Sequence, residues 1–238
     1  ARPWANRPYP LITTPTAKGA KASVGSIHVA TGMALAHNLF IRYLNSIYLQ
    51  ATGITRSEDV DAFLLYCRAW CTIIHEHHQG EETTFFSMIA EYTAEKDIMK
   101  TSVEQHNAFD SGIQVFEKYV TETPPKDYSG STLRTLIDNF APALVKHLHA
   151  EISTLLSIGE EFGGEKLRKS YDEWEKQVMK ESRAKSDPYV MLPAGFGAVD
   201  RAFENGAHRN WPEFPWFVPY LNKFVFARTH AKAWQFSP

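Results

Sequence analysis

The sequence predicts an all-α protein: an up-down-up-down four-helix bundle with an extra helix and a C-terminal extension packed on it. Three observations support this fold class. Four long stretches have apolar residues at helical spacing, short loops rich in glycine, proline or serine separate them, and no stretch alternates apolar and polar residues as a strand does. Long helices joined by short loops pack as antiparallel neighbours, which favours a bundle.

Residues 1–25 carry several prolines followed by small and polar residues, so we expect an N-terminal arm lying on the domain. The bundle is expected over 26–162. Its first helix runs from Ser26 to Thr52, where Gly53 follows. The second starts at Ser57, because acidic residues in the next positions favour a helix N-terminus, and continues to about Tyr92.

The third helix is expected from about Glu95 to Val120, where the loop TETPPKDYSG ends it. The fourth runs from about Ser131 to Phe162 and stops at two glycines. We expect 163–238 to hold an additional helix, at about 165–184, and an extension with few helical periods. Its aromatic residues should cover the bundle and roof a pocket, because so much apolar surface is unfavourable in water: Phe196, Phe203, Trp211, Phe214, Trp216 and Phe217.

Composition excludes several classes of protein. The chain is 44% hydrophobic and 22% charged with a net charge of −2, which is ordinary for a globular protein and favours neither nucleic acid nor an anionic membrane as partner. The longest apolar runs are shorter than the roughly 20 residues of a membrane span. Cys67 and Cys71 are interpreted as reduced packing residues, which favours a cytoplasmic location. The chain begins at Ala1, which leaves open a removed leader.

The stretch HEHHQGEETTFF, residues 75–86, is the most informative part of the chain. A helix turns about 100° per residue, so each side chain can be assigned a face. His77 and Glu81 then lie in the middle of the apolar stripe of the second helix. His78 and Glu82 have the same spacing but point roughly 100° and 140° away. The stripe therefore selects His77 with Glu81.

The other three helices each place one histidine on an apolar stripe. His147 is followed four residues later by Glu151, while His37 and His106 stand alone. A single core histidine is more often structural than a ligand. Four of them with two carboxylates are harder to explain, because a buried unpaired carboxylate costs several kcal/mol. Metal cations would supply the missing charge. Imidazole with carboxylate suits iron, manganese or zinc, and two bridging glutamates favour two ions.

Four segments of the sequence resemble the hemerythrin-like (HHE cation-binding) domain family: HNLFIRYL, HHQGEETTFF, EQHNAF and HLHAEIS, within about residues 28–160. The tryptophan- and proline-rich ends are similar to the fungal branch of that family. The resemblance implies a non-haem di-iron centre bridged by two carboxylates and an oxo or hydroxo group. By motif position its ligands would be His37, His77, Glu81, His106, His147 and Glu151.

One position departs from the oxygen-carrying members of the family. Asp110 stands where those proteins have a second histidine in the third helix, so reversible oxygen carriage is disfavoured. We expect Asp110 to be an extra ligand or the hydrogen-bond partner of a ligand imidazole. The hypothesis is an oxidoreductase that activates O2 or peroxide on a small organic substrate. The alternative is a protein that binds, senses or stores O2, NO or iron without turnover.

The remaining histidines are interpreted as structural. His75, His78 and His149 are expected at the surface or against the tail, and His28 lies off its stripe. We expect no acidic residue at ligand spacing from His208 or His230, and therefore no metal site in the tail.

Overall fold

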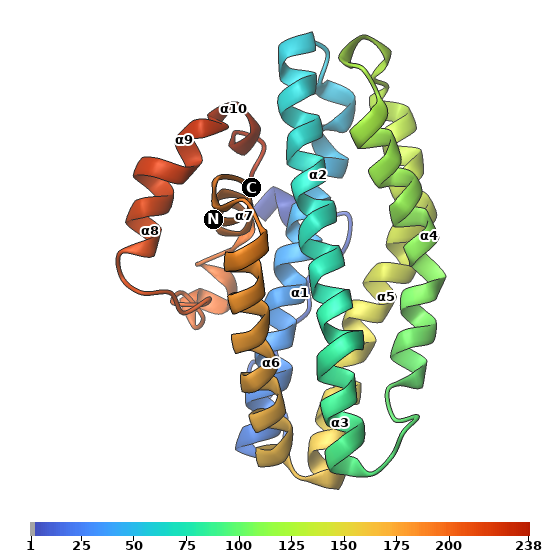
Figure 1. Cartoon of the computed structure of the whole chain (residues 1–238), viewed down its shortest axis with the longest axis vertical. Helices are drawn as coiled ribbons and strands as arrows, with labels where there is room; N and C mark the ends of the chain where they lie inside the picture. Colours follow the sequence, from blue (N-terminus) through green and yellow to red (C-terminus); the bar gives the residue numbers. More distant parts are fainter. Residues whose placement is uncertain (1–2) are drawn as a thin grey trace.

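A computed structural model describes residues 3–238 and confirms the all-α class, with no strand among these residues. Four helices form the bundle: α1 (Val24–Gln50), α2 (Ser57–Gly80), α4 (Lys100–Glu122) and α5 (Gly130–Phe162) (Figure 1). The extra helix α6 (Gly164–Lys185) packs along α1 and also contacts α2 and α5. The short helices η1 (Pro3–Asn6), η2 (Ala51–Gly53) and η4 (Pro125–Asp127) lie in the arm and the loops.

Helix α1 is the central helix of the molecule, because α5, α6 and α2 all pack on it. Its start is capped by the Ser23 side chain, which accepts a hydrogen bond from the Ser26 amide. The segment Val24–Gly53 is long and apolar enough on average to cross a membrane, although polar residues interrupt its apolar runs, and much of it is buried inside the protein. A buried core helix of a soluble protein has this composition, and here it carries a histidine to the centre of the bundle.

The second helix of the bundle changes its winding in the middle. After α2, a π-helical turn, η3 (Glu81–Phe85), leads into α3 (Phe86–Thr93), and the Phe86 amide donates to the Glu81 carbonyl five residues earlier. Single π-turns within α-helices are uncommon and occur mostly at functional sites. The turn shifts the facing of every residue after Glu81 relative to a regular helix.

Helix α5 is the longest helix and ends where the sequence predicts, at Phe162. Its N-terminus is capped by Ser129, whose side chain accepts from the Thr132 amide. Gly163 follows with a φ of 113°, a conformation that favours glycine, and α6 begins at the next residue.

Segments near both ends of the described residues pack on α1. The Asn38 side chain bonds to the amide and carbonyl of Ile12 in the arm. The carbonyl of Phe236 near the C-terminus accepts from Ser46 and, at 2.7 Å, from Gln50. The Phe236 ring packs 4.9 Å from that of Phe63 in α2.

The C-terminal extension differs from the expectation in two ways. Residues Pro188–Ala198 form helix α7, because Asp187 caps the helix and a proline fits its first turn. After η5 (Phe203–Gly206), the segments α8 (Val218–Leu221), η6 (Asn222–Phe226), α9 (Ala227–Thr229) and α10 (Ala231–Trp234) follow, with α8 and α9 to the side of the bundle (Figure 1). Trp216 and Phe217 do not roof a pocket: Trp216 is 80% exposed. Phe196, Trp211 and Phe214 lie further inward.

Candidate metal centre

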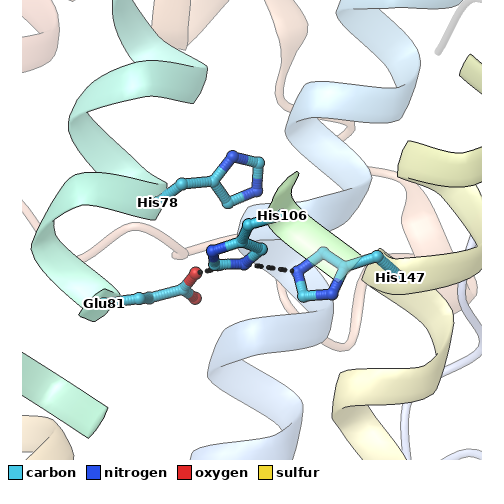
Figure 2. A group of neighbouring side chains, drawn as sticks. All are labelled: His78, Glu81, His106 and His147. Carbon is cyan, nitrogen blue, oxygen red and sulfur yellow. Dashed lines mark hydrogen bonds and ion pairs between the residues drawn. The ribbon is translucent and has the colours of Figure 1, made fainter. Parts of the chain in front are cut away.

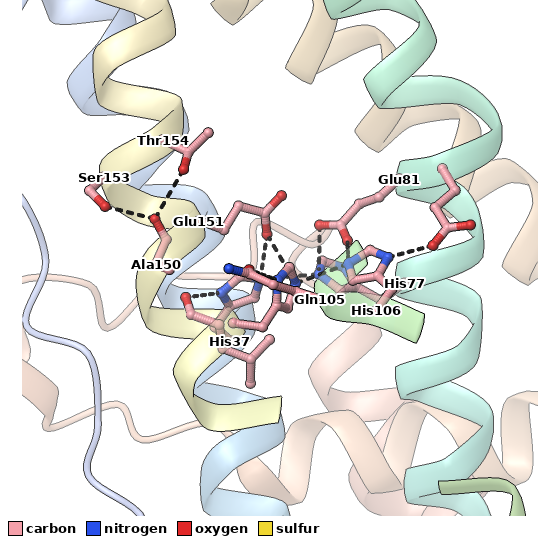
Figure 3. Close-up of polar contacts among 12 residues, drawn as sticks. His37, His77, Glu81, Gln105, His106, Ala150, Glu151, Ser153 and Thr154 are labelled. Carbon is pink, nitrogen blue, oxygen red and sulfur yellow. Dashed lines mark hydrogen bonds and ion pairs between the residues drawn. The ribbon is translucent and has the colours of Figure 1, made fainter. Parts of the chain in front are cut away.

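The structure brings all six predicted ligand residues together in the middle of the bundle. Figure 3 labels His37, His77, Glu81, His106 and Glu151 among them. Each bundle helix supplies one histidine, α5 also supplies a glutamate, and the second glutamate is the first residue of the π-turn: His37, His77, His106, His147, Glu151 and Glu81. All six are buried. The assignment of these residues as ligands remains a prediction, which their geometry supports.

The four histidines form two pairs. The Nε2 atoms of His37 and His77 lie 3.2 Å apart, and those of His106 and His147 lie 3.0 Å apart. We call these the α1/α2 pair and the α4/α5 pair. Each pair therefore joins two neighbouring helices and directs its ring nitrogens into the bundle.

The two glutamates each connect one pair to the other. Glu81 places Oε1 3.0 Å from Nε2 of His77 and Oε2 3.6 Å from Nε2 of His106. The Oε2 atom of Glu151 lies 3.5 Å from His37 Nε2 and 3.8 Å from His147 Nε2. A carboxylate that contacts both pairs is placed to bridge two metal ions.

Hydrogen bonds at the outer ring nitrogens fix the histidine tautomers. Nδ1 of His37 lies 2.8 Å from the Leu148 carbonyl, which can only accept, so Nδ1 carries the proton. Nδ1 of His106 donates to Glu82 Oε1 at 2.6 Å, and Nδ1 of His147 donates to the Gln105 amide oxygen at 3.0 Å. Such outer bonds orient imidazole ligands and raise their basicity.

These tautomers leave the α4/α5 pair in need of a cation. With both protons on Nδ1, the facing Nε2 atoms of His106 and His147 present two lone pairs to each other at 3.0 Å. Two nitrogens bound to one metal at about 2.1 Å and a right angle would stand about 3.0 Å apart. The spacing is therefore that of two donors to one metal ion.

The pKa values of the buried histidines and glutamates also favour a bound metal cation. Burial lowers the pKa of His77 to about 3 and of His147 to about 2, so both rings are neutral and free to donate lone pairs. Burial also raises the pKa of Glu81 and Glu151 well above the ordinary value, and the neighbouring charges of Glu82 and Glu81, respectively, add to this. Within residues 3–238, no lysine or arginine forms an ion pair with either glutamate. A metal cation fits this donor set.

His78 is a site residue that the helical-wheel argument placed wrongly. It is only 9% exposed, and its buried Nε2 has no hydrogen-bond partner among the described residues. Its ring lies 4.4 Å from that of His106, and it forms a potential metal-binding group with Glu81, His106 and His147 (Figure 2). The group of His37, His77 and Glu81 lies on the other side, so Glu81 belongs to both.

His78 is buried because α2 packs against helices on two sides. His77 faces α1, whereas His78, about 100° further round, faces α4 and α5. The sequence contains the signal for this second face in a stripe of buried residues at spacings of three and four: Val60, Leu64, Cys67, Cys71, Ile74 and His78.

Asp110 does not take the expected role toward His106. Its carboxylate accepts a hydrogen bond from Gln114 at 2.6 Å, and the Nδ1 of His106 is occupied by Glu82 instead. Glu82, which the helical wheel also pointed away, lies after the start of the π-turn. Its side chain remains 41% exposed, so it links a buried histidine to the surface.

Four of the other histidines have hydrogen-bond partners: His28, His75, His149 and His208. His75 pairs with Glu117 at 3.1 Å, and His149 contacts the Pro10 carbonyl at 3.0 Å. His208 does have an acidic partner at ligand spacing, contrary to expectation: Glu204 lies 3.0 Å away and also holds Thr14 of the arm. Cys67 and Cys71 are buried and unbonded to each other.

A pocket of about 220 Å³ reaches the α4/α5 pair from the surface between α2 and α4. His78, His106 and Phe109 line its inner end, and Glu82 and Asp110 line it as well. By contrast, aromatic rings cover the α1/α2 pair. The ring centroids of Phe40 and Trp174 lie 4.7 Å and 5.8 Å from that of His77. Small molecules would therefore approach from the α4/α5 side.

Comparison with known proteins agrees with this geometry. The family model of the hemerythrin HHE cation-binding domain matches residues 28–158. A curated protein from Cryptosporiopsis sp. (strain 8999), the "dimeric xanthone biosynthesis cluster protein R11", is 38% identical over 237 residues, which cover 99% of this chain and 88% of that protein. No solved structure matches. Domains of this family bind metal cations, typically iron, and the chain described here belongs to the hemerythrin HHE cation-binding domain family.

Proposed function

We propose that the protein is a non-haem di-iron oxidoreductase that uses O2 or peroxide to oxidise a small organic substrate. The observation that supports it most is the pair of glutamates, each of which contacts both histidine pairs. Such an arrangement suits two metal ions that share carboxylate ligands, and iron held there would supply the redox chemistry.

The residues of the chain have distinct tasks in this proposal. His37 and His77 would hold one ion, His106 and His147 would hold the other, and Glu81 and Glu151 would connect the two. The Leu148 carbonyl and the side chains of Glu82 and Gln105 keep the rings in the correct tautomer and orientation. The surrounding aromatic rings exclude water from the α1/α2 side. His78 adds a fifth imidazole beside the open side of the centre.

Two further arguments favour oxidation over oxygen carriage. Asp110 stands where the oxygen-carrying members of the family have a second histidine in the third helix, which disfavours reversible release of O2. The relative from Cryptosporiopsis is named for a biosynthesis cluster, which is consistent with a role in metabolism. A cytoplasmic location stays a prediction.

The alternative function is binding or sensing of O2, NO or iron without turnover. One observation favours it: the pocket that reaches His78 and His106 has only about 220 Å³. Pockets for organic ligands usually have about 300–1,000 Å³, so this one suits O2 or peroxide better than a substrate.

Oxygen uptake distinguishes the two functions. Iron-loaded, reduced protein is mixed with O2 in an oxygen electrode, with ascorbate as electron donor. An oxidoreductase should consume many equivalents of O2 per centre. A binding protein should take up about one equivalent and release it when O2 is removed. His77→Ala should abolish the uptake, whereas the matched His149→Ala should not, because the His149 ring contacts the Pro10 carbonyl of the arm and does not line the pocket.

A further inference from the structure

A second cavity lies on the other side of the molecule, between α1, α6 and the segment 211–214. Its volume is about 790 Å³, several times that of the pocket beside His78 and within the usual range for an organic ligand. Trp211, Phe214 and Met179 give it an apolar wall, and charged residues of α6 line the rest.

Tyr171 of α6 lines this cavity with an unpartnered hydroxyl. The residue is only 5% exposed, yet its hydroxyl makes no hydrogen bond to any residue among 3–238. The oxygen is not among the fully buried polar atoms, so it is accessible from the cavity. The hydroxyl stands over Gly32 of α1, where an added Cβ would come within 2.6 Å of it. The lack of a side chain at Gly32 therefore leaves room for this hydroxyl at the edge of the cavity.

Glu175 lies one helical turn after Tyr171 and also faces the cavity. It forms no ion pair or hydrogen bond with the described residues, whereas the nearby Asp172 pairs with His28 at 3.2 Å and Arg168 at 3.7 Å. Partial burial raises the pKa of Glu175, with Asp172 adding to the rise. The cavity therefore offers a hydroxyl donor and a free carboxylate acceptor on the same face of one helix.

Tyr171 also separates this cavity from the metal centre. Its ring packs 5.8 Å from Phe85 and 5.6 Å from Trp174, and Trp174 in turn lies 5.8 Å from His77. The charges of Glu81 and Glu151 contribute to the raised pKa of Tyr171, after burial and two acidic residues of α6.

We propose that this cavity binds a planar aromatic molecule with a phenolic hydroxyl, and that this molecule is the organic substrate of the metal centre. It would lose electrons to the centre through the rings of Trp174 and Tyr171, and its hydroxyl proton to Glu175, while O2 would accept the electrons at the centre. The ligand hydroxyl accepts from Tyr171 and donates to Glu175, while its rings pack against Trp211 and Phe214. A phenol satisfies both polar groups at once. The role as substrate rests on the oxidoreductase function proposed above, whereas the binding site does not.

Binding to the metal-loaded full chain tests the proposal by calorimetry. The probes are 2-naphthol, 2-methoxynaphthalene, which has no hydroxyl to donate, and the anion 2-naphthoate. The wild type should bind 2-naphthol about tenfold more tightly than either analogue, since a hydrogen bond to a charged group contributes roughly that much. Tyr171→Phe and Glu175→Gln should each weaken 2-naphthol binding about five- to tenfold. Glu175→Gln should also remove most of the preference over 2-methoxynaphthalene, because that preference comes from the hydrogen bond that the ligand donates to Glu175.

Matched controls keep the result interpretable. Tyr220→Phe removes the hydroxyl of an exposed tyrosine of α8 and should bind all probes as the wild type does. Metal content and melting temperature should be those of the wild type in both cavity variants. Equal affinity for 2-naphthol in the wild type and Tyr171→Phe, or no binding of 2-naphthol by the wild type, overturns the proposal. Preferred binding of 2-naphthoate overturns the phenol class.

Oxygen uptake in the same samples separates this proposal from the proposed function. Tyr171-dependent binding of 2-naphthol without catalytic O2 consumption would keep the binding site and overturn the oxidoreductase. Catalytic O2 consumption without binding of 2-naphthol would do the reverse.

Discussion

The two histidine pairs of the centre are held in different ways. His37 of the α1/α2 pair is anchored by a backbone carbonyl and His77 is covered by aromatic rings. The α4/α5 pair is anchored by the side chains of Glu82 and Gln105 and adjoins a pocket open to the surface. Backbone and core contacts make one side rigid and closed, whereas side chains that reach the surface leave the other accessible. From this difference we expect the first pair to have mainly a structural role and small molecules to reach the second pair.

Removal of the metal should have the largest effect, because both pairs then lose the cation that compensates two buried carboxylates. Ligands present at about a thousand times their dissociation constant stabilise a fold by about 4 kcal/mol, which corresponds to roughly 10 °C in melting temperature for a chain of this size. Calorimetry of chelated and reloaded protein measures it. Identical melting temperatures would mean that the buried groups are satisfied without metal.

Substitution of Glu81, which contacts both histidine pairs, should have the second-largest effect. Glu81→Ala should lower the bound metal from two ions per chain to fewer than one, since Glu81 contacts both pairs. His37→Ala should remove mainly the ion of the α1/α2 pair. Elemental analysis gives the stoichiometry, with the exposed Glu91→Ala as control. If Glu81→Ala kept two ions, the bridging role would be wrong.

Substitution of an anchor should affect one pair only. Glu82→Gln weakens the hold on His106 Nδ1, so it should reduce affinity for the ion of the α4/α5 pair by about ten- to a hundredfold. Asp110→Ala should change it much less, because Asp110 bonds to Gln114. Competition with a chelator measures both variants. A larger loss in Asp110→Ala than in Glu82→Gln would restore the role that the sequence suggested for Asp110.

Blocking the pocket should have the smallest effect. Asn107 lies at the pocket and is exposed, so Asn107→Trp should slow binding of azide to the iron-loaded protein several-fold and leave metal content unchanged. Stopped-flow absorbance measures the rate, with the exposed Asn139→Trp of α5 as control. Equal rates in the two variants would show that small molecules enter elsewhere.

The sequence predicts the helices of the bundle well, because their limits depend on local signals. Ser129 caps α5, and glycines or prolines follow the ends of α1, α4 and α5. The π-turn at Glu81 and the packing of the tail depend on contacts between distant segments. For the same reason Trp216 could not be distinguished from Trp211 by composition: one is exposed and the other lines a cavity.

The sequence predicts those site residues that lie on the main apolar face of each helix. A single apolar stripe identifies His77 with Glu81 and His147 with Glu151, and the structure brings these residues together. It misses His78, because a bundle helix has a second buried face toward its other neighbour. It misses Glu82, because the π-turn changes the facing of residues after Glu81.

X-ray absorption at the iron edge tests the central claim most directly. In two-metal sites the ions lie about 3.5–4 Å apart, so the iron-loaded protein should show iron–iron scattering at about that distance and nitrogen from several imidazoles per iron. The scattering should disappear in Glu81→Ala. A spectrum without iron–iron scattering in fully loaded wild-type protein would contradict a centre with two ions shared by Glu81 and Glu151.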